Sequence, residues 1–353
     1  VFTRLEWPAA IKALPGVAVL VFSLCFTSFA VVLTLGGGPR ATTIEVAIYQ
    51  ALRFDFDIPT AVVLALLQIA LCAALLALST AVGRPTVFGG RLESKSTRFP
   101  DRSWLTWLII GLGAAFTLAP LLAVAIRGLN PSLPQLLADA QVWHAIGVTA
   151  VAGVGAGILA VALAIGLLLS ARHLQVRRGQ VGRSRVLASL GMVVLVMPGV
   201  VLSAGLFLLL RSTIDVFAHG LWLIIAVNAL IGLPFACAVL HQPLVALSER
   251  ADKLCAALGI TGWARTRVIE WPVLRRPLGL SLGLCSALAA GDLTAIALFG
   301  SQQLQTLPMI LYQLIGSYRL AEAAATALLL LLLALSIFTL FDRGLGGSSR
   351  AQT

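Results

Sequence analysis

The chain has 353 residues, of which 59% are hydrophobic and 11% charged, and its mean hydropathy is +0.99. This composition excludes a soluble globular protein. The net charge of +11 could suit a nucleic-acid partner, but the placement of the basic residues argues against one, as shown below. The five cysteines lack a CxxC spacing, so we predict neither a disulfide framework nor a metal site. The sequence starts with Val1 and no signal peptide precedes it, so we expect an N-terminally truncated fragment.

Eight apolar segments approach or exceed the roughly 20 residues that a helix needs to cross a bilayer core. Isolated strands cannot satisfy their backbone in lipid, so we predict that all of them are helices. The expected fold class is an all-α membrane protein, a polytopic helical bundle with about eight transmembrane helices. In chain order the segments cover about Leu14–Leu35, Pro59–Ala81, Trp104–Ile126, Trp143–Leu169, Val186–Leu210, Phe217–Leu240, Leu278–Phe299 and Ala323–Phe341.

Two polar segments interrupt the first half of the chain. Arg40–Ile58 is mixed in charge and contains Tyr49, and we expect it to lie at a membrane interface. Residues 83–103 are basic and rich in Gly, Ser and Pro, which is typical of a linker. We interpret them as a cytoplasmic linker between two repeats.

The distribution of basic residues predicts the orientation of the chain. Twenty of the 25 lysines and arginines fall in alternate connecting segments, including residues 83–103, Arg172–Arg185 and Gln242–Pro277. The positive-inside rule places these segments in the cytoplasm and Gly300–Glu322 outside. Membrane topology therefore explains the basic charge, and we predict no nucleic-acid partner.

An internal repeat relates the two ends of the sequence. Leu5-Glu6-Trp7-Pro8 is matched 264 residues later by Ile269-Glu270-Trp271-Pro272, and Tyr49-Gln50 by Tyr312-Gln313 after a one-residue slip. Both copies start on the cytoplasmic side, so the repeat is parallel. We expect residues 1–82 to be the last two helices of one half, 104–345 a second half of six helices, and 346–353 a tail.

The segment 242–277 has the strongest internal order among the polar stretches. Leu247, Ala251, Leu254, Cys255 and Leu258 recur at helical spacing, and Gly259 stands where a helix end favours glycine. We expect a second short helix from Thr261 towards Ile269, ended by Pro272. A basic helix–turn–helix between two spans suits a docking surface, although a solvated interfacial helix is the plain alternative.

Few residues in the sequence are candidates for a catalytic or substrate-binding site. There is no GxxxxGK[ST] phosphate loop, Ser/His/Asp group or HExxH motif, so we predict no catalytic site and no cofactor on this chain. Asp292 is an acidic residue deep in a predicted span; it could line a polar path or form a helix-packing hydrogen bond. Trp222, Phe299 and Tyr312 could face a cationic substrate, although aromatic side chains at the membrane interface are commoner.

The spacing from Gly259 to Ile269-Glu270-Trp271-Pro272 resembles the cytoplasmic signature of ABC importer permeases, which runs Glu-Ala-Ala, three residues, Gly, nine residues, Ile-x-Leu-Pro. Lys253-Leu254-Cys255 departs from that triplet. A closer resemblance, to the permease of bacterial thiamine and thiamine-pyrophosphate importers, lies in the run Leu35–Leu52 with its Gly-Gly-Gly-Pro start, together with Leu307-Pro308 and Tyr312–Arg319.

This resemblance extends over nearly the whole chain and implies a type I importer permease with both halves fused in one polypeptide. Its partners would be two copies of a cytoplasmic ABC ATPase, which carries the ATP, and a periplasmic thiamine-binding protein. The residues that the resemblance assigns to ATPase coupling are Leu254, Ala257, Leu258, Gly259, Ile269, Glu270 and Pro272, and Glu6, Trp7 and Pro8 would be the remnant of the first-half signature. The location would be the bacterial inner membrane, in contact with lipid. A permease for ferric iron or another small solute, and a secondary transporter, stay open as alternatives.

Overall fold

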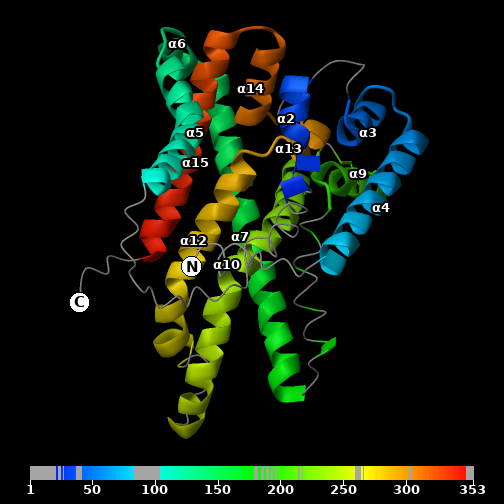
Figure 1. Ribbon diagram of the computed structural model, residues 1–353. Helices are drawn as coiled ribbons and strands as arrows, with labels where there is room; N and C mark the ends of the chain where they lie inside the picture. The colour runs from blue at the N-terminus through cyan, green and yellow to red at the C-terminus, as the bar shows by residue number, and fades with distance from the viewer. Residues whose placement is uncertain are drawn as a thin grey trace.

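The computed structural model is a bundle of helices (Figure 1). It describes residues 21–22, 25–26, 28–36, 42–82, 104–178, 182–183, 187, 191, 194, 197–213, 215–216, 218–258, 264, 266–301 and 304–346. The helices are α2 (Phe29–Val31), the π-helical turn η2 (Val32–Gly36), α3 (Ile44–Arg53), α4 (Ile58–Val82), α5 (Trp104–Gly128), α6 (Ser132–Ala138), α7 (Ala140–Arg178), α9 (Gly199–Leu210), α10 (Gly220–Leu258), the π-helical turn η4 (Thr266–Glu270), α12 (Trp271–Ala290), α13 (Thr294–Phe299), α14 (Leu307–Gly316) and α15 (Leu320–Gly346).

The predicted all-α fold class is confirmed. Among the described residues, five helical stretches are long and apolar enough to cross a membrane: Trp107–Gly128, Ala140–Arg172, Gly220–Val245, Arg267–Ala290 and Leu320–Gly346. Shorter apolar helices cover Ile58–Ala74, Gly199–Leu210 and Leu307–Gly316. The protein therefore crosses a membrane several times.

Three of the eight predicted spans differ from the structure or lie partly beyond it. Most of Leu14–Leu35 falls outside the described residues, and of Val186–Leu210 only α9 is a continuous described helix. The span Leu278–Phe299 is wrong as one helix, because the chain breaks at residues 291–293 between α12 and α13. Gly291 ends α12 and the Asp292 side chain caps the start of α13, so the break has a local cause.

Helix α12 lies at the centre of the bundle and uses small residues on two faces. A Cβ added to Gly279 would lie 2.6 Å from the Phe341 carbonyl oxygen of α15, and one on Gly283 would lie 3.0 Å from that of Phe338. On the other face, a Cβ on Gly157 of α7 would lie 2.1 Å from Ser286 Oγ. Close backbone approach through Gly-xxx-Gly spacing is a common way for helices to associate in lipid, where apolar burial drives little.

The N-terminal helices pack against the second part of the chain through one shared core. Buried side chains of α3 meet buried side chains of α9, α10 and α13 in a single cluster. The members that α3 contributes are Val46, Ile48, Tyr49, Ala51 and Leu52. The helical part of Arg40–Ile58 is thus buried against protein, and its position at a membrane interface stays a prediction. Its apolar residues follow helical spacing and form a buried face, which the mixed charge of the segment obscured.

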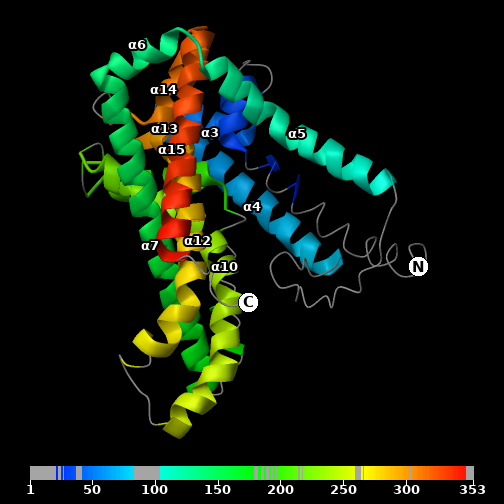
Figure 2. The ribbon, with the colours of Figure 1, turned by 90° about the vertical axis from the view of Figure 1, so that its left-hand side faces the viewer.

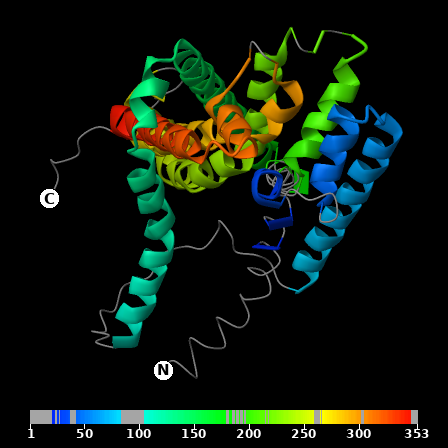
Figure 3. The same ribbon diagram turned by 90° about the horizontal axis from the view of Figure 1, so that it is seen from above.

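The positions of the helix ends in the bundle agree with the predicted membrane topology. Figure 1 places the lower ends of α7 and α10 at one end of the bundle, and α6 and α14 at the opposite end. Helix α5 leans away from the others in Figures 2 and 3, and its large side chains are exposed along most of its length. Exposed apolar side chains on a helix of this length are typical of lipid contact.

The two copies of the sequence repeat have closely similar local structures. In both, an extended Thr precedes a helix of ten residues: Thr43 before α3 and Thr306 before α14. In both, a turn with a positive φ angle follows, at Phe56 (51°) and Tyr318 (58°), and a long helix begins directly afterwards. How the chain divides into two halves stays a prediction.

Candidate functional site

The first candidate site is an arm at the end of the bundle that the sequence predicts to be cytoplasmic, formed by the lower parts of α10 and α12. Helix α10 runs without a break from Gly220 to Leu258, although Pro234 and Pro243 lie inside it. The predicted separate helix in 242–277 is therefore wrong: the span continues as the arm. An internal proline costs about 3 kcal/mol through a lost hydrogen bond and a clash. Buried packing of Leu244 and Leu247 just beyond Pro243 offsets this cost.

The chain returns through η4 directly into α12. Pro272 lies in the first turn of α12, so the prediction that it ends a helix is wrong. Proline suits that position because the missing N–H has no partner in a first turn. Buried Leu247 of α10 packs against Ile269 of η4 and Leu274 of α12. Leu247, the first of the apolar residues at helical spacing, therefore holds the arm together and does not face outward.

The other predicted arm residues fall into three groups. Ile269 and Glu270 are half-buried, and Glu270 precedes α12. Leu254, Ala257 and Leu258 lie on the last turns of α10, but their side chains lie outside the described set. Gly259, Glu6, Trp7 and Pro8 lie outside the described residues altogether.

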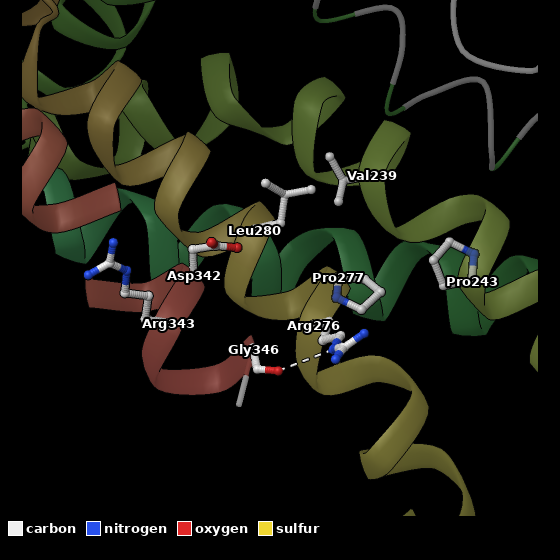
Figure 4. A pocket seen from close by; sticks show the side chains of 8 residues that line it. All are labelled: Val239, Pro243, Arg276, Pro277, Leu280, Asp342, Arg343 and Gly346. Carbon is white, nitrogen blue, oxygen red and sulfur yellow. Dashed lines mark hydrogen bonds between the residues drawn. The ribbon is translucent and has the colours of Figure 1, made fainter. Parts of the chain in front are cut away.

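A cavity of about 730 Å³ opens where the arm meets the bundle. Figure 4 shows Val239 and Pro243 of α10, three residues of α12 and the end of α15 around it. Arg276 Nε donates a hydrogen bond to the Gly346 carbonyl oxygen at 3.2 Å, which ties α12 to the end of α15. Arg343 extends away from Arg276 in this view. The arm is thus tied to α15 at its base.

Asp292 lies in the break between α12 and α13, so the prediction that it stands deep in a continuous span is wrong. Its Oδ2 accepts a hydrogen bond from the Ala295 backbone N–H at 3.1 Å, and its own N–H donates to the Ala289 carbonyl oxygen at 3.3 Å. The hydrogen-bonding role that we left open is therefore present in the structure. A role in a polar path stays a prediction.

The second candidate site is a buried polar pair that the sequence reasoning missed. Glu45 of α3 and Gln68 of α4 are 1% and 0% exposed, and Gln68 Nε2 donates to Glu45 Oε1 at 3.1 Å. Helical spacing could have found it, because Glu45 lies on the same face as Ile48, Tyr49 and Leu52, three, four and seven residues on. A carboxyl group buried in a membrane protein is costly and is usually functional.

The three aromatic candidates occupy different environments. Trp222 is 68% exposed at the start of α10, which fits the interfacial alternative. Phe299 is fully buried in the shared core. Tyr312 of α14 is half-buried against that core, which also contains Tyr49. Phe299 and Tyr312 therefore both lie in or against the core that α3 shares.

Comparison with known proteins relates the chain to one kind of transporter. It is 43% identical over 346 residues to the thiamine transport system permease protein ThiP of Salmonella typhimurium, and equally to that of Escherichia coli. These alignments cover 97% of this chain and 64% of each relative. The similarity to these permeases extends over nearly the whole of this chain.

A protein of the same name from a third bacterium is similar to nearly the same extent. The ThiP protein of Haemophilus influenzae is 40% identical over 337 residues, which are 93% of this chain and 61% of that relative. No protein-family model matches the chain. The chain thus spans somewhat less than two-thirds of the length of these relatives. The relationship and the apolar helices together indicate a multi-pass protein of the bacterial inner membrane.

Proposed function

We propose that this chain is the greater part of the membrane-spanning permease subunit of an ATP-driven importer that moves thiamine into the cytoplasm. The observation that supports this most is the 40–43% identity, over nearly the whole chain, to proteins named as thiamine transport permeases. Thiamine phosphates, which share the same cationic ring, belong to the same proposal.

The partners follow from the class of transporter. The chain has no phosphate-binding loop, so ATP hydrolysis falls to a separate cytoplasmic ATPase, present in two copies, and this chain binds no cofactor. A periplasmic thiamine-binding protein would deliver the substrate. Binding of the ATPase falls to the arm, through Leu254, Ala257, Leu258 and Gly259 on one side of its tip and Ile269, Glu270 and Pro272 on the other.

The geometry of α12 supplies a route from the arm to the membrane interior. The helix runs from the base of the arm for 20 residues, about 30 Å at 1.5 Å per residue, and ends beside the break at Asp292. Close glycine contacts hold it against α7 and α15, so it moves with them as a rigid body. A displacement of the arm by the ATPase would therefore shift α13 against α3, which suits alternating access by movement of the two halves.

Uptake of labelled thiamine tests the proposal. The full-length permease is expressed with its ATPase and binding protein in a bacterial strain that can neither make nor import thiamine. We expect growth on external thiamine and accumulation of label that disappears when the ATPase is omitted. Accumulation without the ATPase would indicate a secondary transporter. Absence of accumulation, with the permease in the membrane, would contradict thiamine as the substrate.

A further inference from the structure

We propose that the cavity at the base of the arm binds a phospholipid whose headgroup carries both a phosphate and a primary ammonium group, the chemistry of phosphatidylethanolamine. The phosphate would accept hydrogen bonds from Arg276, the ammonium group would donate to Asp342, and an acyl chain would cover the apolar wall beside them. The proposal goes beyond the transport function, because it holds whatever solute the protein moves.

The cavity lies where helices reach the end of their membrane-spanning stretches. On α10 it is lined by the last turns of the apolar stretch Gly220–Val245, and on α15 by the last turns of Leu320–Gly346. The 27 residues of Leu320–Gly346 extend over about 40 Å at 1.5 Å per residue, close to the thickness of a bilayer with its headgroup regions. The cavity is therefore at the level of the lipid headgroups, at the end of the bundle that the sequence predicts to be cytoplasmic.

One wall of the cavity is apolar. Figure 4 shows Val239 and Pro243 of α10 on this side, with Pro277 and Leu280 of α12. Leu280 is 41% exposed in the protein alone. An exposed leucine beside a cavity at the headgroup level is typical of a surface that a lipid chain covers. The volume of about 730 Å³ is within the range of sites that bind small molecules.

The other wall presents charges of both signs. Figure 4 shows the Asp342 carboxylate between the guanidinium groups of Arg276 and Arg343, which extend in different directions. All three side chains are exposed. Within the part of the chain that the structure describes, the side chains of Asp342 and Arg343 take part in no ion pair or hydrogen bond. Arg276 uses its Nε for the bond to Gly346, which leaves both Nη groups for a ligand.

The mixture of charges distinguishes between classes of phospholipid. A guanidinium group binds a phosphate well, because its N–H groups can donate two parallel hydrogen bonds. A purely anionic headgroup would gain this contact with Arg276 but would be repelled by Asp342. A quaternary ammonium headgroup has no N–H to donate to the carboxylate. A headgroup with a phosphate and a primary ammonium group satisfies both residues, so the lining favours this class.

A lipid in this cavity would stiffen the base of the arm. Arg276 is on α12 and Asp342 is on α15, so one headgroup would bridge the two helices in addition to the hydrogen bond between Arg276 and Gly346. An acyl chain on Val239 would contact α10 as well. The two helices of the arm would then move together with α15.

The first experiment measures lipid binding to the full-length permease after detergent purification and removal of lipid. The probe is phosphatidylethanolamine with a fluorophore on its acyl chain, and its binding is followed by fluorescence anisotropy. We expect Arg276→Gln to weaken binding about tenfold, which corresponds to a loss of about 1.4 kcal/mol of charge-assisted hydrogen bonding. The control is Arg127→Gln, which removes an exposed arginine at the end of α5 and should bind the probe like the wild type.

A second experiment tests the ammonium group and does not depend on the Arg276 variant. Unlabelled phosphatidylethanolamine, phosphatidylglycerol and phosphatidylcholine compete with the probe. We expect phosphatidylethanolamine to compete about threefold better than the other two, as for an ion pair at a partly exposed site. Asp342→Asn should remove its advantage over phosphatidylglycerol, because the repulsion of the anionic headgroup disappears.

A third measurement separates a lipid from a free phosphate. Leu280→Trp would fill the apolar side of the cavity and leave Arg276 in place. We expect this variant to bind the probe more weakly, and inorganic phosphate in large excess to leave the probe bound to the wild type. Displacement by inorganic phosphate would indicate a phosphate site and overturn the lipid site.

The remaining outcomes also decide the proposal. Equal affinities of Arg276→Gln and Arg127→Gln for the probe would overturn the cavity as the binding site. Stronger competition by phosphatidylglycerol than by phosphatidylethanolamine in the wild type, or an unchanged order of the lipids in Asp342→Asn, would refute the pairing of the ammonium group with Asp342. These measurements use no transport, so they stand even if the protein imports no thiamine.

Discussion

The close contact between α7 and α12 predicts that a single methyl group added to α7 destabilises the protein. In Gly157→Ala, the new Cβ would lie 2.1 Å from Ser286 Oγ and 3.0 Å from the Ser286 backbone nitrogen. The hydroxyl can rotate away, but the backbone can give way only if the two helices separate. Overpacking of this kind costs about 1–3 kcal/mol. Alanine also gains up to about 1 kcal/mol of helix propensity over glycine. Gly157→Ala should therefore lower the free energy of unfolding by about 0–2 kcal/mol.

A matched control isolates the packing cost. Gly166 lies nine residues further along the same helix, and a Cβ there would meet nothing within 4 Å. Gly166→Ala should gain the same helix propensity without the clash, so the two variants should differ by about 1–3 kcal/mol. We would measure the thermal midpoint of the detergent-purified full-length protein, and expect Gly166→Ala at or above the wild type and Gly157→Ala below it.

A double variant tests which atoms are responsible. Ser286 Oγ has no hydrogen-bond partner among the described residues, so Ser286→Ala alone should be nearly neutral. Combined with Gly157→Ala, it removes the 2.1 Å contact but keeps the contact with the backbone nitrogen. We expect a partial recovery of the thermal midpoint. Equal midpoints for Gly157→Ala and Gly166→Ala would refute the close approach of α7 and α12.

Three further predictions address sidedness, the break after α12 and the arm. A membrane-impermeant thiol reagent should label Ser317→Cys in intact cells and label Trp271→Cys only after the cells are opened; the reverse would overturn the topology. Asp292→Ala should lose about 1 kcal/mol of stability with its cap, whereas Asp292→Asn should keep the bond to the Ala295 N–H yet import less thiamine; normal uptake by the Asn variant would exclude a path role. Leu258→Glu should reduce copurification with the ATPase without changing membrane insertion, and normal copurification would make the arm an ordinary connection.

Hydropathy predicted the long helices well because the bilayer imposes one simple requirement, a sufficient length of apolar residues. The helices α4, α5, α7 and α15 cover the corresponding predicted spans, and α10 begins three residues after the predicted start at Phe217. Hydropathy failed where the helix is broken inside an apolar region, as at Asp292, because one capping side chain outweighs its hydrophobic neighbours. It failed at Pro243 for the opposite reason, since tertiary packing maintains a helix that local rules would end.

The site was harder to predict than the fold because it depends on contacts between distant segments. Asp292 attracted attention because hydrophobic residues surround it in sequence. Glu45 did not, because its neighbours Arg40, Arg53 and Asp55 make the segment read as surface. It is buried in the folded bundle, where Gln68 of α4 donates a hydrogen bond to it. The sequence repeat identified Tyr49 and Tyr312 as equivalent residues, but not that both lie in or against the same core.

The contacts around α13 bear on how movement of the arm would reach the rest of the bundle. Asp292 accepts a hydrogen bond at the start of α13 and directly follows α12, the helix that leads from the arm. At the other end of α13, Arg53 ties α3 to the Gly300 carbonyl oxygen, and α3 is in turn held against α4 by the bond between Glu45 and Gln68. A displacement of α12 would therefore act first on α13, and the Arg53 contact would pass it to α3 and α4. The first part of the chain would then follow the arm without a direct contact to it.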